Sequence, residues 1–109
     1  MSAAFIYVTA SDQEEAFQIG QVLVEERLVA CANILGSITA MYWWEGKVEK
    51  NSEVALVLKT RAELVDAVTE KINFIHSYDC PCIVALPVTG GDVKFLNWLK
   101  TETGYANRK

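Results

Sequence analysis

The sequence predicts a mixed α+β fold, with strands and helices in the order β-α-β-β-α-β and a further helix at the C-terminal end. Length and composition support it, because 109 residues of which 51% are hydrophobic and 22% charged suit a single domain (residues 1–109) with a packed core. Periodicity supports it too, since runs rich in β-branched and aromatic residues alternate with segments of helical spacing. Turn chemistry adds a hairpin, because Glu45-Gly46-Lys47 separates the two longest strand-like runs.

The first half of the chain supplies a strand, a helix and a long strand. Residues 5–10 form a short β-branched and aromatic run. Ser11 and Glu14 follow with the spacing of a capping box, in which each side chain bonds the other residue's backbone amide, and apolar residues then recur at helical spacing. A β-type run over residues 30–44 comes next and is interrupted by Gly36.

The second half repeats this pattern. Residues 48–60 return as a strand that is polar near the turn and apolar further on. Thr60 and Glu63 have the spacing of a second capping box, and the helix that they open is expected to end near His76. Residues 82–88 then form a nearly continuous apolar strand.

A last short helix is expected after the Gly90-Gly91 turn, with Asp92 as its N-cap and Gly104 as its stop. The complete order is the split βαβ arrangement of ferredoxin-like folds. Right-handed crossovers would place both main helices on one face of a four-stranded antiparallel sheet.

Charge and cysteine content bear on partners and compartment. The net charge of −4 argues against a nucleic-acid surface and gives no reason to expect anionic lipid as a partner. The N-terminal residues lack the pattern of a secretory signal, and no uncharged run approaches the ~20 residues that span a bilayer. The three cysteines do not suggest a disulfide framework. Reduced thiols in a cytoplasmic protein are therefore expected.

The predicted sheet has no polar face. Residues 54–58 and 82–86 are apolar in both directions, whereas a sheet with one wet face alternates apolar and polar residues. One short C-terminal helix would cover only part of the face opposite the main helices, and an uncovered apolar face of this kind marks a protein interface. The pattern therefore predicts an obligate homo-oligomer.

The run over residues 30–44 is also longer than the domain. It would extend ~50 Å at strand rise, against roughly 35 Å for a domain of this size. Either Gly36 bends the strand at a bulge, or the hairpin overhangs and pairs with a neighbour. Trp43 and Trp44 at the far end are typical interface anchors, although they would equally suit a cap on the molecule's own core.

The segment from His76 to Cys82 concentrates the potential metal ligands. It holds the only histidine and two of the three cysteines, and imidazole nitrogen and thiolate sulfur are the donors that copper and zinc prefer. A complete site would need donors from elsewhere or an open position, so His76, Cys80 and Cys82 are candidate ligands of a soft metal ion. The alternative is a helix end and turn, with two small apolar thiols entering a buried strand.

Several ordered motifs resemble the CutA family of divalent-cation tolerance proteins. They run along nearly the whole chain as Tyr7-Val8-Thr9, Leu28-Val29-Ala30-Cys31-Ala32-Asn33-Ile34, Met41-Tyr42-Trp43-Trp44-Glu45-Gly46-Lys47, Glu53, Leu58-Lys59-Thr60, His76-x-Tyr78-x-x-Pro81 and Leu86-Pro87-Val88. The resemblance implies a homotrimer of ferredoxin-like subunits that is similar to the PII signalling proteins, with hairpins crossing between subunits. It also implies tolerance of copper and other divalent ions, copper binding in some members, and no established catalytic reaction.

Two departures from the family pattern lie in the candidate metal segment. The family has proline after the histidine and glutamate after the later proline, where this chain has Ser77 and Cys82. The resemblance therefore carries over only His76 as a metal ligand, while Cys82 favours a softer ion such as Cu(I). The alternative is that the family's site is lost in this chain.

A different function would use clefts between subunits. Trp44, Lys59 and Tyr78 would present an aromatic wall, a cation and a phenol to a small anionic ligand, as in a PII-like sensing or signalling module. Lys59 would equally suit a solvated strand end. The sequence has no GxSxG, P-loop, HExxH or Rossmann glycine fingerprint, so we expect neither an enzyme nor an organic cofactor.

Overall fold

The computed structural model describes residues 2–104 and confirms the expected order of strands and helices. Its elements are β1 (Ala3–Ala10), α1 (Gln13–Glu25), β2 (Cys31–Trp44), β3 (Lys47–Arg61), the 3-10 turn η1 (Ala62–Leu64), α2 (Val65–Ile75), β4 (Ile83–Pro87) and α3 (Val93–Thr101). Among these helices, none is long and apolar enough to cross a membrane.

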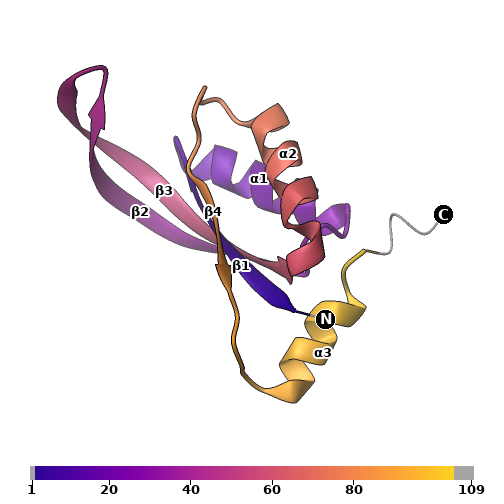
Figure 1. Ribbon diagram of the computed structural model, residues 1–109. Helices are drawn as coiled ribbons and strands as arrows, with labels where there is room; N and C mark the ends of the chain where they lie inside the picture. The colour runs from indigo at the N-terminus through magenta and orange to yellow at the C-terminus, as the bar shows by residue number, and fades with distance from the viewer. Residues whose placement is uncertain (1, 105–109) are drawn as a thin grey trace.

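The four strands form one antiparallel sheet in the order β2-β3-β1-β4. Helices α1 and α2 lie on the same face of this sheet, while α3 sits beyond its end, near the start of β1 (Figure 1). The mixed α+β, ferredoxin-like architecture predicted from the element order is confirmed.

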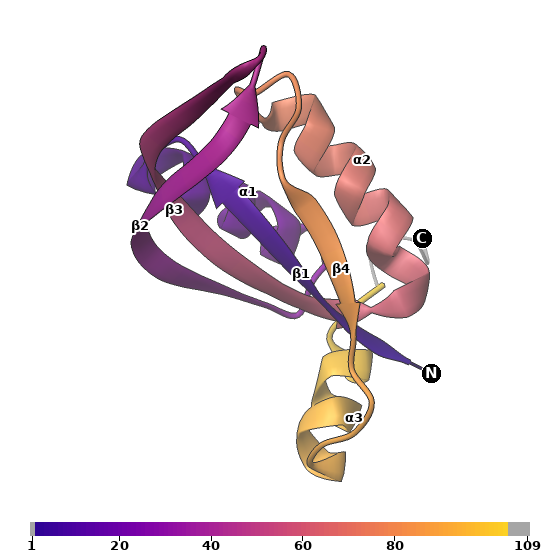
Figure 2. The ribbon, with the colours of Figure 1, turned by 60° about the vertical axis from the view of Figure 1, so that its left-hand side comes forward.

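The β2–β3 hairpin extends beyond the other two strands (Figures 1 and 2). β1 pairs with β3 only over residues 54–61, so residues 47–53 pair with β2 alone. β2 is also bent, because Leu35 is an extra residue between the paired Ile34 and Gly36, and Gly36 has a φ of 111° that favours glycine. The long strand therefore contains a bulge and also overhangs the sheet.

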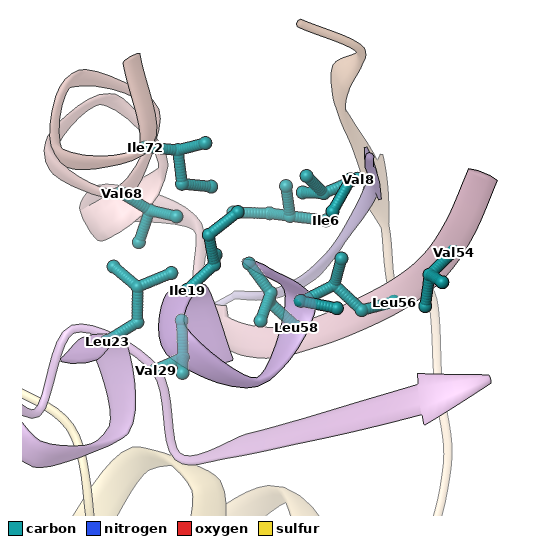
Figure 3. Close-up of a cluster of buried hydrophobic side chains, with 12 residues drawn as sticks. Ile6, Val8, Ile19, Leu23, Val29, Val54, Leu56, Leu58, Val68 and Ile72 are labelled. Atoms are coloured by element: carbon teal, nitrogen blue, oxygen red, sulfur yellow. The ribbon is translucent and has the colours of Figure 1, made fainter. Parts of the chain in front are cut away.

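The core lies between the sheet and the two long helices (Figure 3). Alternate residues of β1 and β3 pack against one stripe of each helix. The fully buried members include Ile6, Val8, Leu56 and Leu58 from the strands and Ile19, Leu23, Val68 and Ile72 from the helices. Burying each side chain of this size contributes ~1.5–3 kcal/mol to the stability of the folded state. This contribution determines which face of each strand is turned toward the helices.

The opposite side of the sheet, which we call the open face, is also apolar. On it Tyr7 pairs with Val57 of β3 and with Val84 of β4, and Phe5 pairs with Leu86. Neither α1 nor α2 covers this row, and Leu86 is 54% exposed. The apolar runs in the sequence correctly predicted a sheet without a polar face.

The cap of α1 differs from the expected one by a residue. Asp12 is the N-cap, and its carboxylate accepts a hydrogen bond from the Glu15 amide at 2.8 Å. Glu15 reaches back to the Ser11 amide at 2.9 Å. The capping box predicted for Ser11 and Glu14 is therefore wrong, because Asp12 and Glu15 offer the same spacing one position later.

The second predicted capping box is also wrong. Thr60 is fully buried in β3, and its hydroxyl donates to the Leu28 carbonyl at 2.7 Å instead of capping a helix. The turn η1 and helix α2 follow without a side-chain cap. The predicted end of α2 at His76 and the N-cap at Asp92, which accepts from the Phe95 amide at 3.0 Å, are confirmed.

Candidate functional site

A hollow of about 860 Å³ opens on the open face, between the overhanging hairpin and the segment that leads from α2 into β4. Figure 2 shows this segment beside the tip of the hairpin. The side chains that matter for its chemistry are Tyr42, Trp44, Glu53, Tyr78, Cys80 and Cys82. We call this cavity the hairpin hollow.

Glu53 of β3 provides the negative charge of the hairpin hollow. The residue is only 9% exposed, and its Oε2 accepts a hydrogen bond from the Tyr78 hydroxyl at 2.8 Å. It lies on the open face opposite Ile38 of β2, directly before the apolar run of β3. Glu53 was not among the site residues predicted from the sequence. The available signal was a single acid at the point where a hairpin strand becomes wholly apolar.

Tyr78 is a permanent hydrogen-bond donor in this position. Burial raises the pKa of its phenol well above the ordinary value, and the hydrogen bond to Glu53 and the charge of that carboxylate raise the pKa further. Tyr42, on the hairpin wall, accepts a hydrogen bond from the Asn51 side chain at 2.6 Å. The polar groups of the hairpin hollow are thus held in fixed positions by neighbouring side chains.

Cys80 and Cys82 both line the hairpin hollow as free thiols. Desolvation by the surrounding walls raises the pKa of Cys82, and the negative charge of Glu53 raises it further. The Cys82 thiol is therefore largely protonated at neutral pH. A metal ion that binds it must displace this proton.

His76 is fully buried and uses both ring nitrogens within the chain. Nε2 lies 2.8 Å from the Thr9 carbonyl, and Nδ1 lies 3.0 Å from the Tyr78 amide nitrogen. Because a carbonyl only accepts and an amide only donates, the ring carries its proton on Nε2 and accepts on Nδ1. The imidazole fastens the start of the 76–82 segment to β1 and leaves no unbonded nitrogen.

Glu15 fastens the same segment to α1. Its two carboxylate oxygens accept from the Ser77 amide at 2.8 Å, the Ser77 hydroxyl at 3.1 Å and the Ser11 amide and hydroxyl at 2.9 Å. Burial alone would raise the pKa of Glu15, but these hydrogen bonds lower it to about 2. This role of Glu15 could not be predicted from the sequence, because it depends on contact between residues 62 positions apart.

The geometry limits what a metal ion can find in one chain. Within residues 2–104, no three His, Cys, Asp or Glu side chains come together as a metal-binding group. His76 is held by Thr9 and Tyr78, whereas Cys80 and Cys82 face the hairpin hollow. A resident metal with a closed set of ligands does not fit this arrangement. Cys80 and Cys82 remain exposed as free thiols.

The three residues predicted for an anion pocket are not brought together in one chain. Trp44 and Tyr78 both line the hairpin hollow. Lys59 lies near the other end of the open face, where its Nζ is 5.3 Å from the centre of the Phe5 ring and 5.5 Å from that of Phe95. A single chain therefore offers an anion an acidic hollow instead of the predicted cation.

Comparison with known proteins gives consistent matches over nearly the whole chain. The model of the family described as CutA1 divalent ion tolerance protein matches residues 4–102. A relative from Oryza sativa subsp. japonica, named Protein CutA 1, chloroplastic, is 44% identical over 98 residues, which are 90% of this chain and 55% of the relative. The chain thus spans about half the length of that relative. The family description names ion tolerance and no enzymatic reaction.

Solved structures agree with the fold. The crystal structure of CutA1 from Oryza sativa has a TM-score of 0.93 and 41% identity, covering 96% of both chains. The periplasmic divalent cation tolerance protein CutA from Archaeoglobus fulgidus has a TM-score of 0.89 and 42% identity, covering 92% of this chain and 97% of its own. Similar proteins are thus described as chloroplastic and as periplasmic. These descriptions contradict the predicted cytoplasmic location, which was wrong. It was inferred from reduced thiols, and free thiols do not identify the compartment.

Proposed function

Because the chain belongs to the CutA1 family of divalent ion tolerance proteins, we propose that it is a copper-binding protein that works as a homotrimer, with the ion held as cargo by Cys80 and Cys82. The observation that carries the proposal is that both thiols line one hollow on the open face. Thiolate sulfur selects soft ions, and Cu(I) is the soft ion of copper.

His76 stays a predicted third donor. To ligate a metal, its Nδ1 would have to release the Tyr78 amide, and that amide would then need another acceptor. The side chain would also have to become accessible from its fully buried position. We therefore expect the imidazole to contribute less to copper affinity than either thiol.

The trimer is supported by the side chains that the open face leaves uncovered. Val84 and Leu86 of β4 are about half exposed, and on the hairpin Trp44, which shares the face of Glu53, is 46% exposed. Specific interfaces bury about 800 Å² on each partner, with aromatic residues enriched at their centre. A second copy seated on the open face would remove this apolar row from water.

Exchanging cysteines for serine tests the copper site. We expect Cys80→Ser and Cys82→Ser each to weaken Cu(I) binding by more than about a hundredfold, because loss of groups outside the ligand shell already costs roughly 10–100-fold. The measurement is competition with a chromophoric Cu(I) chelator, together with metal analysis and the mass in solution. Cys31→Ser is the matched control, since Cys31 lies in β2 and does not line the hairpin hollow.

The outcomes separate the parts of the proposal. One copper per chain that is lost in both thiol variants and kept in Cys31→Ser supports the site. Unchanged affinity in Cys80→Ser and Cys82→Ser would show that the assignment is wrong. His76→Ala should weaken binding less than either serine variant, and a larger loss would make the imidazole a principal ligand.

Copper affinity should rise with pH. The pKa of Cys82 is raised, so the folded protein carries a proton on this thiol at neutral pH that the metal must displace. Below the raised pKa, the apparent affinity should increase about tenfold per pH unit for each proton released. Chelator competition between about pH 6 and pH 8 measures this slope, and a flat profile would contradict ligation by thiols.

The sensing function predicted for Trp44, Lys59 and Tyr78 stays a prediction. It requires a neighbouring copy to bring Lys59 to the hairpin hollow, because one chain holds Lys59 against Phe5 and Phe95 instead. Thermal-shift measurements with nucleotides and carboxylates test it, since a bound ligand raises the melting temperature.

A further inference from the structure

Glu53 is a buried charge without a cationic partner. Glu53 is nine-tenths buried. Among the described residues, the single hydrogen bond to its carboxylate comes from the neutral Tyr78 hydroxyl. Within residues 2–104, no lysine, arginine or histidine nitrogen lies within 4.0 Å of its carboxylate, since the ion pairs found there involve other acids. Burying a charge is costly unless it is paired, so the hairpin hollow is electrostatically incomplete in one chain.

Lys59 is the complementary case. It lies on the open face of the same strand, half buried, with its ammonium near the rings of Phe5 and Phe95. The negative faces of aromatic rings hold a cation but do not neutralise its charge. In the described part of the chain, no carboxylate lies within 4.0 Å of this ammonium. Lys59 is thus a partly dehydrated cation on the apolar face that we propose is covered by another copy.

The two charges cannot meet within one chain. Both belong to β3 and share its open face, because odd-numbered residues of this strand point to the same side. They are six residues apart, which is about 20 Å at strand rise. Between them lie Ala55 and Val57, so the open face has an acid at the hairpin end, an apolar centre and a base at the α3 end.

The other described cations suit the hairpin hollow less well. Arg27, Arg61 and Lys71 already contact Glu102, Glu63 and Glu26 respectively. Lys47 and Lys50 are exposed residues of the hairpin, and Lys94 and Lys100 are exposed residues of α3. Lys59 alone combines partial burial, a place on the open face and no carboxylate partner within residues 2–104.

We infer that Lys59 of one copy enters the hairpin hollow of the next copy and forms an ion pair with Glu53. The inference rests on the proposed homotrimer and names the polar contact that sets its register. In a ring of identical subunits, each interface joins two different patches. The proposed ion pair would make these patches the hairpin end of one copy and the α3 end of its neighbour. The acid–apolar–base order of the open face is complementary to itself in this head-to-tail sense.

The Glu53–Lys59 ion pair would also change what the predicted anion pocket can bind. A partner subunit's Lys59 would join Trp44 and Tyr78 in the hairpin hollow, and the three predicted residues would then be assembled between copies. Its charge would be neutralised by the Glu53 carboxylate. We therefore expect no net positive site for a small anion at this interface.

A double-mutant cycle tests the pair. The variants are Glu53→Gln, Lys59→Met and the two combined, because these changes remove charge while keeping the size of the side chains. The measurement is the trimer dissociation constant, obtained by sedimentation on dilution at a fixed sub-denaturing guanidinium concentration. We expect each single variant to raise the trimer dissociation constant. The dissociation constant of the double variant should be at least about tenfold lower than the value obtained by multiplying the two single effects.

Charge reversal gives an independent readout. Glu53→Lys and Lys59→Glu should each dissociate the trimer, and the Glu53→Lys, Lys59→Glu double variant should restore it. Lys50→Glu is the matched control, since it makes the same charge change on the opposite face of β3 and should have no effect. Circular dichroism of each variant verifies that the chain is folded.

Failure of the pair and failure of the trimer look different. If the single effects multiply and reversal is not rescued while the parent remains a trimer, the Glu53–Lys59 assignment is wrong and the proposed trimer stands. If the parent sediments as a folded monomer at low micromolar concentration, the proposed trimer and the pair both fall.

Discussion

Replacing Leu86 by aspartate should split the proposed trimer into folded monomers, whereas the same replacement at Phe74 should leave the trimer intact. Leu86 lies on β4 in the apolar row of the open face, paired with Phe5 of β1. Phe74 lies on α2, on the other side of the sheet, and is 83% exposed. The two sites therefore receive the same new charge in different environments.

The size of the effect follows from desolvation. A carboxylate buried in an interface without a partner costs several kcal/mol, and a closed ring of three copies carries this cost at each contact. A loss of about 3 kcal/mol already raises a dissociation constant more than a hundredfold. At Phe74 the new carboxylate stays in water, where a surface substitution changes stability by about 0.5 kcal/mol or less.

Sedimentation velocity of the parent and the two variants at low micromolar concentration is the measurement. Circular dichroism verifies that Leu86→Asp is still folded, as we expect because Leu86 is not part of the buried core. A trimer that tolerates aspartate at Leu86 would show that the open face is not the interface.

The order of strands and helices could be predicted because it depends on local patterns. The apolar spacing of the helices and the runs that are apolar on both faces of a strand are patterns within a few consecutive residues. The same helices and strands are present in the folded chain. The capping box at Thr60 failed because its hydroxyl bonds the Leu28 carbonyl, a partner that only the folded sheet supplies. Local spacing identifies a residue that could cap a helix, but tertiary contacts decide which bond it makes.

The candidate site was predictable to the same extent. The sequence shows that His76, Cys80 and Cys82 belong to one segment, but not which of them face the hairpin hollow. The directions of their side chains depend on long-range contacts, since the Thr9 carbonyl, 67 positions earlier in the chain, accepts a hydrogen bond from Nε2 of His76. Sequence spacing also could not show that Lys59 lies apart from Trp44 and Tyr78. Lys59 lies at the end of β3 that pairs with Cys31, whereas Trp44 pairs with Lys47 at the hairpin end of the same strand.

Glu15 has no local signature of its role, and its replacement should destabilise the folded chain measurably. Its carboxylate joins the first turn of α1 to Ser77, and its side chain is 12% exposed. The hydrogen bonds lower its pKa from the ordinary 4.5 to about 2. A shift of this size sets an upper limit of about 3 kcal/mol on the stabilisation of the folded state, and solvent screening reduces it because the bonds from Ser11 and Ser77 lie at the surface.

The pH dependence follows from the sign of this shift. A carboxyl group whose pKa is lower in the folded state contributes its full stability above the unfolded value of 4.5 and loses it as pH falls toward 2. We expect Glu15→Gln to cost about 1–2 kcal/mol at neutral pH, and the difference from the parent to shrink steadily below about pH 4.5. Glu14→Gln is the matched control, since Glu14 is exposed on the same turn of α1 and should have little effect.

Guanidinium unfolding of the parent, Glu15→Gln and Glu14→Gln across this pH range measures the effect. If the free-energy difference between the parent and Glu15→Gln stays constant from neutral to acid pH, the stabilisation does not come from the ionised carboxylate. If it shrinks as expected, the bonds from Ser11 and Ser77 are what hold the thiol-bearing segment against α1. Acid would then loosen that segment before it unfolds the core, because the packing of Ile6, Leu56 and Ile72 involves no titrating group.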